Sequence, residues 1–414
     1  MCGCFRRSGD CHSTSGILFA VNKDNRLGLV LAGGAARGAY EAGVLRFIYS
    51  SLATRLGFSP WPSIVGGTSV GALNGVFVVT QQLEYIQRIS RMWQEVTIGD
   101  VYLFEGGGVF STVRSLLRAA QEGALLNPAP LRRLVRREFP RAAMRRSIDS
   151  GDCQAFIISA TRLDNGLNTL FCDSAMQDLT IDPPKGTMVR RGDIDEQHFL
   201  ASTSLPFFFP PHKIGPHYYV DGGLRQNTPL RPVIRSGADR ILIIGAGADE
   251  EFTGGGQAED ITPSLPFLAG KTLNALLLDP VSRDLHHTEQ INRVLAWGRE
   301  QYGEEYSQRI AAALGVREVA TLFLRPKTDL GRIASEIFVS NPPKTTPQVR
   351  WLMSLVADQA NAEGGESDFL SYLFFDHEYT GVLERMGYED ARDQEEVLAQ
   401  FFLSDSHPDE ARIT

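Results

Sequence analysis

Several features that define other classes of protein are missing from this chain of 414 residues. It has no apolar run of about 18 residues, the length that a membrane-spanning helix needs. The N-terminal segment contains two arginines but no apolar stretch after them, so it does not read as a secretory signal. We therefore expect a cytoplasmic protein, in contact with membranes only as a peripheral protein.

Cysteine and positive charge are also scarce. The five cysteines do not predict a disulfide framework, because their number is odd and three lie near the N-terminus: Cys2, Cys4, Cys11, Cys153 and Cys172. The first three, followed by a histidine, match no zinc motif, and nothing else in the sequence supports an acylated membrane anchor there. The net charge of −8 argues against general nucleic-acid binding.

Apolar runs that alternate with helical patterns indicate the fold. Leu27–Ala32 and Arg240–Gly245 are largely apolar, as in strands buried on both faces of a parallel sheet. Residues 154–162 and 167–172 flank Asn165-Gly166, a pair typical of a tight hairpin turn. With helix-like stretches between the strands, this order predicts a three-layer α/β/α fold with a mainly parallel central sheet.

The character of the chain changes after about residue 250. Gly254-Gly255-Gly256 marks a flexible break, and the remainder is mostly helical in pattern, with one strand expected at Val319–Leu324. We therefore predict a flexible tail over residues 1–25, a core over residues 26–250 that carries the chemistry, and a mostly helical region over residues 251–414 packed on that core.

The first candidate motif lies in Ser63–Gly75. Gly67-Thr68-Ser69-Val70-Gly71 is a G-x-S-x-G pentapeptide between a short apolar run and a helix-compatible run. A nucleophile elbow has this context: a sharp turn exposes the serine, and the residues two before and two after it must be small. Alone the pentapeptide is weak, because an ordinary strand-to-helix turn can share it.

The second motif is the glycine-rich segment Gly33-Gly34-Ala35-Ala36-Arg37-Gly38, which follows the first strand. It matches neither common nucleotide-binding pattern. Its backbone N–H groups suit either a phosphate or a developing oxyanion beside the serine, and a plain turn at the start of a helix is the third interpretation. Arg37 could fix the loop or face an anionic group.

The third motif, Asp221-Gly222-Gly223, ends a short strand and is by itself a common turn sequence. Asp221 is a candidate functional residue because a serine hydroxyl needs a base before it can act as a nucleophile. The late histidines are poor candidates for that base, since none follows a clear strand: His286, His287, His377 and His407. A Ser–Asp dyad instead needs a glycine-rich loop, an elbow and a later strand-end aspartate, and the chain has them in that order.

These three motifs resemble those of the patatin-like phospholipases, whose patterns are G-G-G-x-[RK]-G, G-x-S-x-G and D-G-[GA]. The resemblance covers roughly residues 27–247 and, more weakly, Leu370–Gly387. It implies that Ser69 is the nucleophile, Asp221 its base and the Gly33–Gly38 loop the oxyanion hole. It further implies hydrolysis of fatty-acyl esters through an acyl-enzyme, with no metal or organic cofactor. The substrate would be a phospholipid, a lysophospholipid or a neutral lipid, and the sequence does not choose among them; we expect phospholipids or lysophospholipids.

One position departs from the family pattern. Ala35 stands where the family usually has its third glycine. Its methyl group narrows the loop or restricts its conformation, because alanine tolerates a positive φ poorly. The backbone N–H remains.

Two further stretches suit a lipid substrate but also have plainer interpretations. Leu131–Arg146, expected to be one helix, carries seven arginines that suit an anionic membrane or simply a solvated surface: Arg132, Arg133, Arg136, Arg137, Arg141, Arg145 and Arg146. Leu205–Pro211 contains three consecutive phenylalanines that would line an acyl-chain pocket or fill the core.

Two other functions fit parts of this pattern. One is an acyltransferase, or an esterase of the α/β-hydrolase type with a histidine base. The other is a non-catalytic protein that uses the same fold to bind a lipid or a partner.

Overall fold

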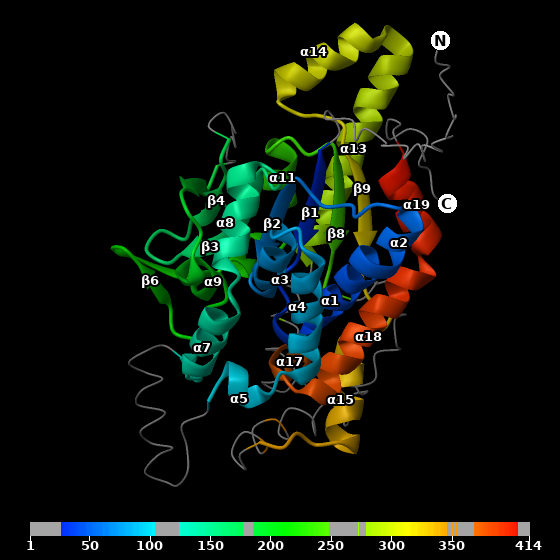
Figure 1. The fold of residues 1–414 in the computed structure, drawn as a ribbon. Coiled ribbons are helices and arrows are strands. Elements are labelled where there is room, and N and C mark those ends of the chain that lie inside the picture. The colour runs from blue at the N-terminus through cyan, green and yellow to red at the C-terminus, as the bar shows by residue number, and fades with distance from the viewer. Residues whose placement is uncertain are drawn as a thin grey trace, which may run out of the picture.

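The structure is a computed structural model that describes residues 26–103, 124–176, 185–247, 272, 279–345, 350, 353 and 368–404. The N-terminal tail, with its three cysteines, lies outside the described residues, as does the glycine run after residue 250. Figure 1 shows the described part as a twisted sheet between helices.

Nine described strands form one sheet: β1 (Leu27–Leu31), β2 (Ile64–Thr68), β3 (Ala155–Arg162), β4 (Asn168–Asp173), β5 (Thr187–Arg191), β6 (His212–Ile214), β7 (His217–Asp221), β8 (Arg240–Ile244) and β9 (Ala320–Leu324). The main order is β5-β4-β3-β2-β1-β8-β9, and β7 pairs with β3 and β6. Within this order, the strands of the part β3-β2-β1-β8-β9 are each parallel to their neighbours. This confirms the mainly parallel sheet that the alternating pattern predicts.

The β3–β4 hairpin also forms as predicted. The strands are antiparallel, with Phe156 opposite Asp173, and Gly166 in the connecting turn has a φ of +66°. A glycine adopts this left-handed conformation without steric penalty, which explains why Asn-Gly marks such turns.

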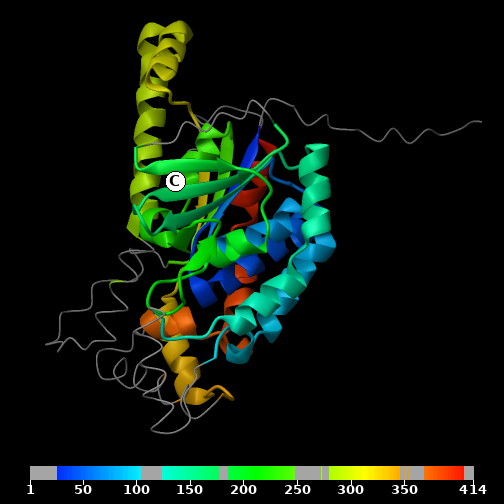
Figure 2. The same cartoon turned by 90° about the vertical axis from the view of Figure 1, so that its left-hand side faces the viewer.

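Helices cover both faces of the sheet, as the two views at right angles show (Figure 2). On one face lie α1 (Gly38–Phe47), α3 (Val70–Val79), α4 (Leu83–Glu95) and α18 (His377–Asp393), while α11 (Leu230–Arg235) and α13 (Asp279–Tyr302) lie on the other. The strand residues alternate accordingly: Leu29 and Leu31 face the first layer, and Val30 faces the second.

The remaining described helices are short or lie at the edges: η1 (Ala35–Arg37), η2 (Ile48–Leu52), α2 (Ala53–Leu56), α5 (Ile98–Val101), α7 (Ala129–Glu138), α8 (Arg141–Ser150), α9 (Glu196–Ser202), α10 (Gly223–Gln226), α14 (Glu304–Leu314), α15 (Leu330–Ser340), α17 (Asp368–Leu373) and α19 (Glu395–Leu403). Together α1, the π-helical turn η2 and α2 form the helix expected after the glycine-rich loop. It ends at Gly57, whose φ is +77°.

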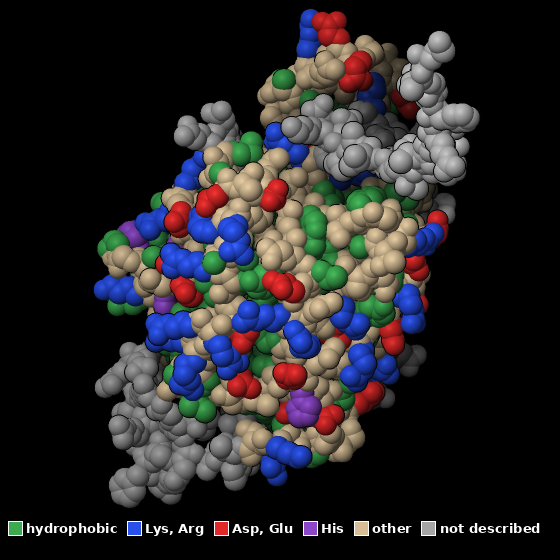
Figure 3. Space-filling view, in the orientation of Figure 1, with side chains coloured by type: hydrophobic (Ala, Val, Ile, Leu, Met, Phe, Trp, Pro, Cys, Tyr) green, Lys and Arg blue, Asp and Glu red, His purple; other side chains and the backbone are tan. Residues whose placement is uncertain are grey.

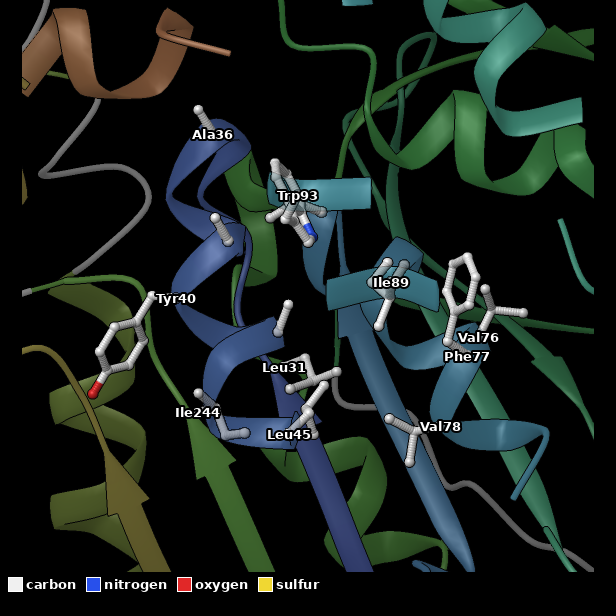
Figure 4. Close-up of a cluster of buried hydrophobic side chains, with 14 of the residues drawn as sticks. Leu31, Ala36, Tyr40, Leu45, Val76, Phe77, Val78, Ile89, Trp93 and Ile244 are labelled. Atoms are coloured by element: carbon white, nitrogen blue, oxygen red, sulfur yellow. The ribbon is translucent and has the colours of Figure 1, made fainter. Parts of the chain in front are cut away.

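The larger core lies between the sheet and the first helical layer (Figure 4). Burial of apolar surface on this scale is the main force that holds the layers together. The figure labels members from β1, η1, α1, α3, α4 and β8: Leu31, Ala36, Tyr40, Leu45, Val76, Phe77, Val78, Ile89, Trp93 and Ile244.

The C-terminal region is closely joined to this core. β9 forms the edge of the main sheet beside β8, and α18 packs along α1. The two helices approach so closely that a Cβ on Gly43 would lie 1.8 Å from the Glu384 carbonyl oxygen. The buried Glu384 carboxylate accepts hydrogen bonds from Arg46, Ser90 and Gln94.

The prediction of a single helix over Leu131–Arg146 is wrong. α7 ends at Glu138 and α8 starts at Arg141, so the basic stretch is divided between two helices. Pro140 explains the break, because proline has no N–H to donate and its ring disfavours helical backbone in the residue before it.

Candidate active site

Ser69 lies at the sharp turn between β2 and α3. Its backbone has φ 54° and ψ −124°, a strained conformation for a residue other than glycine. A Cβ on Gly67 would lie 2.6 Å from the Ala72 nitrogen, and one on Gly71 would lie 2.3 Å from the Leu31 carbonyl oxygen. The two elbow glycines are therefore required by close packing of backbone against backbone.

Asp221 reaches Ser69 through the pairing of two strands with β3. β2 pairs with β3 as far as Thr68, opposite Ser159. β7 is antiparallel to β3 and ends with Asp221 opposite Ala160, the next residue along β3. β4 occupies the other edge of β3, so β2 and β7 meet end to end on the same edge. The Ser69 and Asp221 side chains line one pocket, with the Ser69 hydroxyl near enough to the Asp221 carboxylate to affect its pKa.

The Asp221 carboxylate is buried, with only 3% of the residue exposed. Burial raises the pKa of Asp221 from 3.8 to about 6, since a charged carboxylate loses water contacts there. The nearby Ser69 hydroxyl and the Gly223 N–H, which donates a hydrogen bond to Oδ1 at 2.7 Å, lower this pKa in part. The carboxylate is therefore ionised above about pH 6, where it can accept a proton.

The glycine-rich loop is held at both ends by backbone hydrogen bonds. The Gly33 N–H donates to the Asn227 carbonyl oxygen at 3.1 Å, and Asn227 Nδ2 donates to the Gly33 carbonyl oxygen at 3.0 Å. The Arg37 N–H donates to the Gly34 carbonyl oxygen. The amides of Gly33 and Arg37 are thus already engaged, while Gly34 and Ala35 line the same pocket as Ser69.

Ala35 adopts a φ of +50°, in the left-handed region that glycine enters freely and alanine does not. The loop therefore has the conformation that a glycine would favour, and the methyl group is accommodated at some cost in strain. Ala36 is fully buried in η1, and Gly38 packs on the elbow, since a Cβ there would lie 2.3 Å from the Val70 side chain.

Arg37 fixes the loop, one of the two roles that the sequence left open. Its side chain is buried, Nε donates to Ser371 Oγ at 2.8 Å, and the guanidinium lies 4.2 Å from the centre of the Tyr372 ring. These contacts connect the loop to α17, more than 300 residues later in the chain.

A buried polar cluster supports the start of α1 beneath the loop. Asn74 Nδ2 donates to the Gly38 carbonyl oxygen at 2.9 Å and to Glu41 Oε2 at 2.8 Å, while its Oδ1 accepts from Trp93 Nε1. Burial raises the pKa of Glu41 well above its ordinary value. The cluster links α1, α3 and α4 behind the elbow.

The pocket at Ser69 is predominantly apolar. Ser69, Asp221 and the loop lie at one part of its wall. Hydrophobic side chains from α3, α4 and the residue after it, α5, α7, the segment after α9 and the segment 372–375 form most of the remainder: Val70, Leu73, Met92, Trp93, Val96, Val101, Leu131, Leu134, Leu205, Phe209, Leu373 and Phe375. Such a lining suits the hydrocarbon part of a ligand.

The three consecutive phenylalanines, predicted either to line an acyl-chain pocket or to fill the core, do not share one environment. Phe209 lines the pocket, and Phe208 packs against Phe369 with ring centres 5.5 Å apart. Phe207 is 76% exposed and has a φ of +69°.

The family is settled by sequence comparison. The profile described as patatin-like phospholipase matches residues 29–234, which include all three motifs. Residues 29–234 belong to the patatin-like phospholipase family. The matched relatives include patatin-like phospholipase domain-containing protein 7 of Rattus norvegicus and of Mus musculus, each 25% identical over 259 residues. The match covers 60% of this chain but only 15% of each relative.

Solved structures give weaker likenesses. VipD from Legionella pneumophila has a TM-score of 0.35 at 11% identity, covering 90% of this chain and 67% of VipD. Human GIVD cytosolic phospholipase A2, in complex with methyl gamma-linolenyl fluorophosphonate, has a TM-score of 0.38 at 13% identity, covering 92% and 58%. Neither likeness carries weight for the function of this chain.

No described residue that lines the Ser69 pocket of the patatin-like domain is a histidine. His286 lies on α13, where its Nε2 is 2.8 Å from Gln290 Nε2, and His377 is an exposed residue at the start of α18. His407 lies outside the described residues.

Two polar residues at the site of the patatin-like domain were not predicted from the sequence. Ser202 Oγ accepts the Ser69 N–H at 2.8 Å and donates to the Ser159 carbonyl oxygen at 2.7 Å, which joins the elbow to β3. Asn227 holds Gly33. It lies shortly after the third motif, within the residues 27–247 that resemble the family, which was the one available signal, whereas Ser202 lies in a stretch without any motif.

The pocket role of the segment around α17 was likewise not predicted. Tyr372, Leu373 and Phe375 line the pocket, and the only sequence signal there was the weak family resemblance over Leu370–Gly387. Their apolar character is also that of ordinary core residues, so composition alone could not separate the two roles.

Proposed function

We propose that this domain hydrolyses fatty-acyl esters of phospholipids or lysophospholipids, with Ser69 and Asp221 as a catalytic dyad. The observation that carries the proposal is the strained elbow residue Ser69 beside the buried Asp221 carboxylate, both at the wall of one apolar pocket. The family match supports lipid acyl hydrolysis in general.

In the first half of the reaction, Asp221 accepts the hydroxyl proton as Ser69 Oγ attacks the ester carbonyl carbon. The amides of Gly34 and Ala35 stabilise the oxyanion of the tetrahedral intermediate, at about 3–4 kcal/mol for each donor. The intermediate collapses, the C–O bond to the leaving alcohol breaks, and Asp221 returns its proton to that alcohol. The fatty-acyl group is then esterified to Ser69.

In the second half, a water molecule enters as the nucleophile. Asp221 takes one of its protons, the resulting oxygen attacks the acyl carbonyl, and collapse returns the proton to Ser69 Oγ. The fatty acid leaves. The apolar side chains of the pocket hold the acyl chain throughout, and no metal or organic cofactor takes part in the scheme.

The test is hydrolysis of a p-nitrophenyl acyl ester and of phosphatidylcholine by purified variants. Ser69→Ala and Asp221→Asn should each lose activity while remaining folded by circular dichroism. Ser236→Ala is a matched control, because Ser236 is buried but only donates to the Pro232 carbonyl oxygen in α11. Activity retained in either dyad variant would disprove the scheme, and dependence on His377 with Asp221 dispensable would favour the histidine-based alternative.

A chemical probe separates catalysis from mere binding. A fluorophosphonate should label Ser69 in the native protein and leave the Ser69→Ala variant unlabelled. A native protein that resists labelling and hydrolyses no ester would support the non-catalytic alternative.

We also propose that the exposed side of α7 contacts anionic membrane. Arg132, Arg133 and Arg136 are exposed and form no ion pair with any other described residue, whereas Arg137 pairs with Glu138. Figure 3 shows Lys and Arg side chains gathered over α7 and α8, with acidic side chains between them. The opposite side of α7 lines the pocket through Leu131 and Leu134, so one helix joins the basic surface to the acyl site.

Vesicle binding tests this contact. Arg132→Gln/Arg136→Gln should weaken binding to phosphatidylserine-containing vesicles by about 1 kcal/mol for each charge, and the difference should shrink at high salt. Arg55→Gln/Arg309→Gln is the control of equal charge change, since both arginines are paired with glutamates elsewhere. Equal binding by the two double variants would leave α7 as an ordinary solvated surface.

A further inference from the structure

A second pocket, polar in character, shares Asn227 with the Ser69 pocket. It lies where the starts of β4 and β5 meet the segment from α10 to α11, and α13 contributes Asp284. Besides Asn227, its buried residues are Asn168 and Thr228, and the side chains of Lys185, Arg225 and Arg231 are exposed around it. The proposed hydrolysis assigns no role to any of these five side chains.

The charge of this pocket is positive. Arg231 pairs with Asp284 at 3.0 Å, which balances one of the three cations. Lys185 and Arg225 form no ion pair with any other residue in the described part of the chain. Two cations that line one pocket without a counter-charge favour an anionic ligand there.

The Thr228 hydroxyl is a second, independent indication of a ligand. Thr228 is only 3% exposed, yet its Oγ1 has no hydrogen-bond partner among the described residues. A buried hydroxyl left without a partner destabilises a fold by about 1–3 kcal/mol, so such groups are normally satisfied. Because Thr228 lines the pocket, a bound acceptor oxygen would satisfy it.

We propose that this pocket binds a phosphate group. A phosphate offers several acceptor oxygens in a tetrahedral arrangement, which suits a pocket lined by two cations and a hydroxyl donor from different segments of the chain. The phosphate would belong either to the headgroup of a lipid or to a small soluble molecule. The same side chains would bind both.

The pocket is connected to the candidate active site through the backbone. The Gln226 carbonyl oxygen accepts the Thr68 hydroxyl at 2.9 Å, next to Ser69 in the elbow. Asn227 holds Gly33 by two hydrogen bonds. A phosphate bound beside Gln226, Asn227 and Thr228 would therefore lie next to residues that are hydrogen-bonded directly to the elbow and to the oxyanion loop.

The first arm of the test measures binding without catalysis. The full chain carrying Ser69→Ala is titrated with inorganic phosphate by calorimetry. Adding Lys185→Gln/Arg225→Gln, or Thr228→Val, should weaken phosphate binding about tenfold. The matched controls are Arg91→Gln, an exposed arginine on α4, and Thr169→Val, another buried threonine whose hydroxyl has no partner among the described residues.

The second arm uses the active chain and rests on the proposed hydrolysis. KM is compared for phosphatidylcholine and for diacylglycerol in the same detergent micelles. If the phosphate is that of the substrate headgroup, Lys185→Gln/Arg225→Gln should raise KM about tenfold for phosphatidylcholine and leave KM for diacylglycerol unchanged.

The two arms have separate outcomes. If the pocket variants lose binding of inorganic phosphate, the result supports a phosphate site for a soluble ligand. If they raise KM for phosphatidylcholine alone, the result supports a phosphate site for the lipid headgroup. The proposal is overturned if the variants match their controls in both arms. An inactive but phosphate-binding chain would refute the hydrolysis and leave this site standing.

Discussion

Replacing Asp221 with asparagine should stabilise the protein while removing the proposed base. Burial raises the pKa of Asp221 from 3.8 to about 6, so the folded protein binds this proton more tightly than the unfolded chain does. The ionised carboxylate therefore destabilises the fold. The penalty is fully present above about pH 6 and is lost as the pH falls from 6 to 4.

The size of this effect follows from the shift. A difference between 3.8 and about 6 corresponds to a penalty of about 3 kcal/mol at pH 8 and about half of that at pH 5. Asparagine has nearly the same shape and its amide oxygen can still accept the Gly223 N–H. The substitution should therefore raise the free energy of unfolding by about 1–3 kcal/mol at pH 8.

Urea unfolding of the native and Asp221→Asn proteins at pH 8 and pH 5 measures this difference. The gain in stability should be clearly larger at pH 8. Asp152→Asn, a substitution of an exposed aspartate, is the control and should show little change between the two pH values. A gain that is equal at both pH values, or a loss of stability at pH 8, would refute burial as the origin of the raised pKa.

Three further predictions concern the same site. The logarithm of kcat/KM for a soluble ester should rise with unit slope to about pH 6 and then level off, because only ionised Asp221 accepts the proton; a profile flat from pH 4 to 8 would exclude it as the base. Ala35→Gly should change kcat/KM less than about threefold, since the loop already has a φ that suits glycine, whereas Ala35→Val should abolish activity; tolerance of valine would contradict the left-handed loop. Gly71→Ala should unfold the protein or lower its stability by more than about 2 kcal/mol, because the methyl group would meet the Leu31 carbonyl oxygen, while Gly99→Ala at an open position should be neutral in the same melting experiment.

The parts of the site that the sequence predicts are those with local chemical signatures. The elbow is readable because close packing demands glycine at positions 67 and 71. The hairpin at Asn165-Gly166 is readable because its turn needs a left-handed residue. The break at Pro140 was equally readable, but the regular spacing of arginines around it favoured a continuous helix.

The remaining parts depend on contacts between segments that are distant in the chain. The sequence shows that Ser69 and Asp221 are suitable partners, but only the pairing of β2 and β7 with β3 places them together. The contact of Arg37 with Ser371 joins the glycine-rich second motif to a helix near the end of the described chain. Such contacts leave no periodic or compositional signal in either segment.

The end-to-end meeting of β2 and β7 has a consequence for how this domain can change in evolution. Ser69 and Asp221 sit on strands whose positions are fixed by hydrogen bonds to β3, and not by the length of chain between them. Insertions in the loops between these strands should therefore be tolerated, as long as neither strand slips. A slip of β7 by two residues would carry the carboxylate about 7 Å along β3. We expect natural variation among related chains to fall in the loops and to spare the register of these three strands.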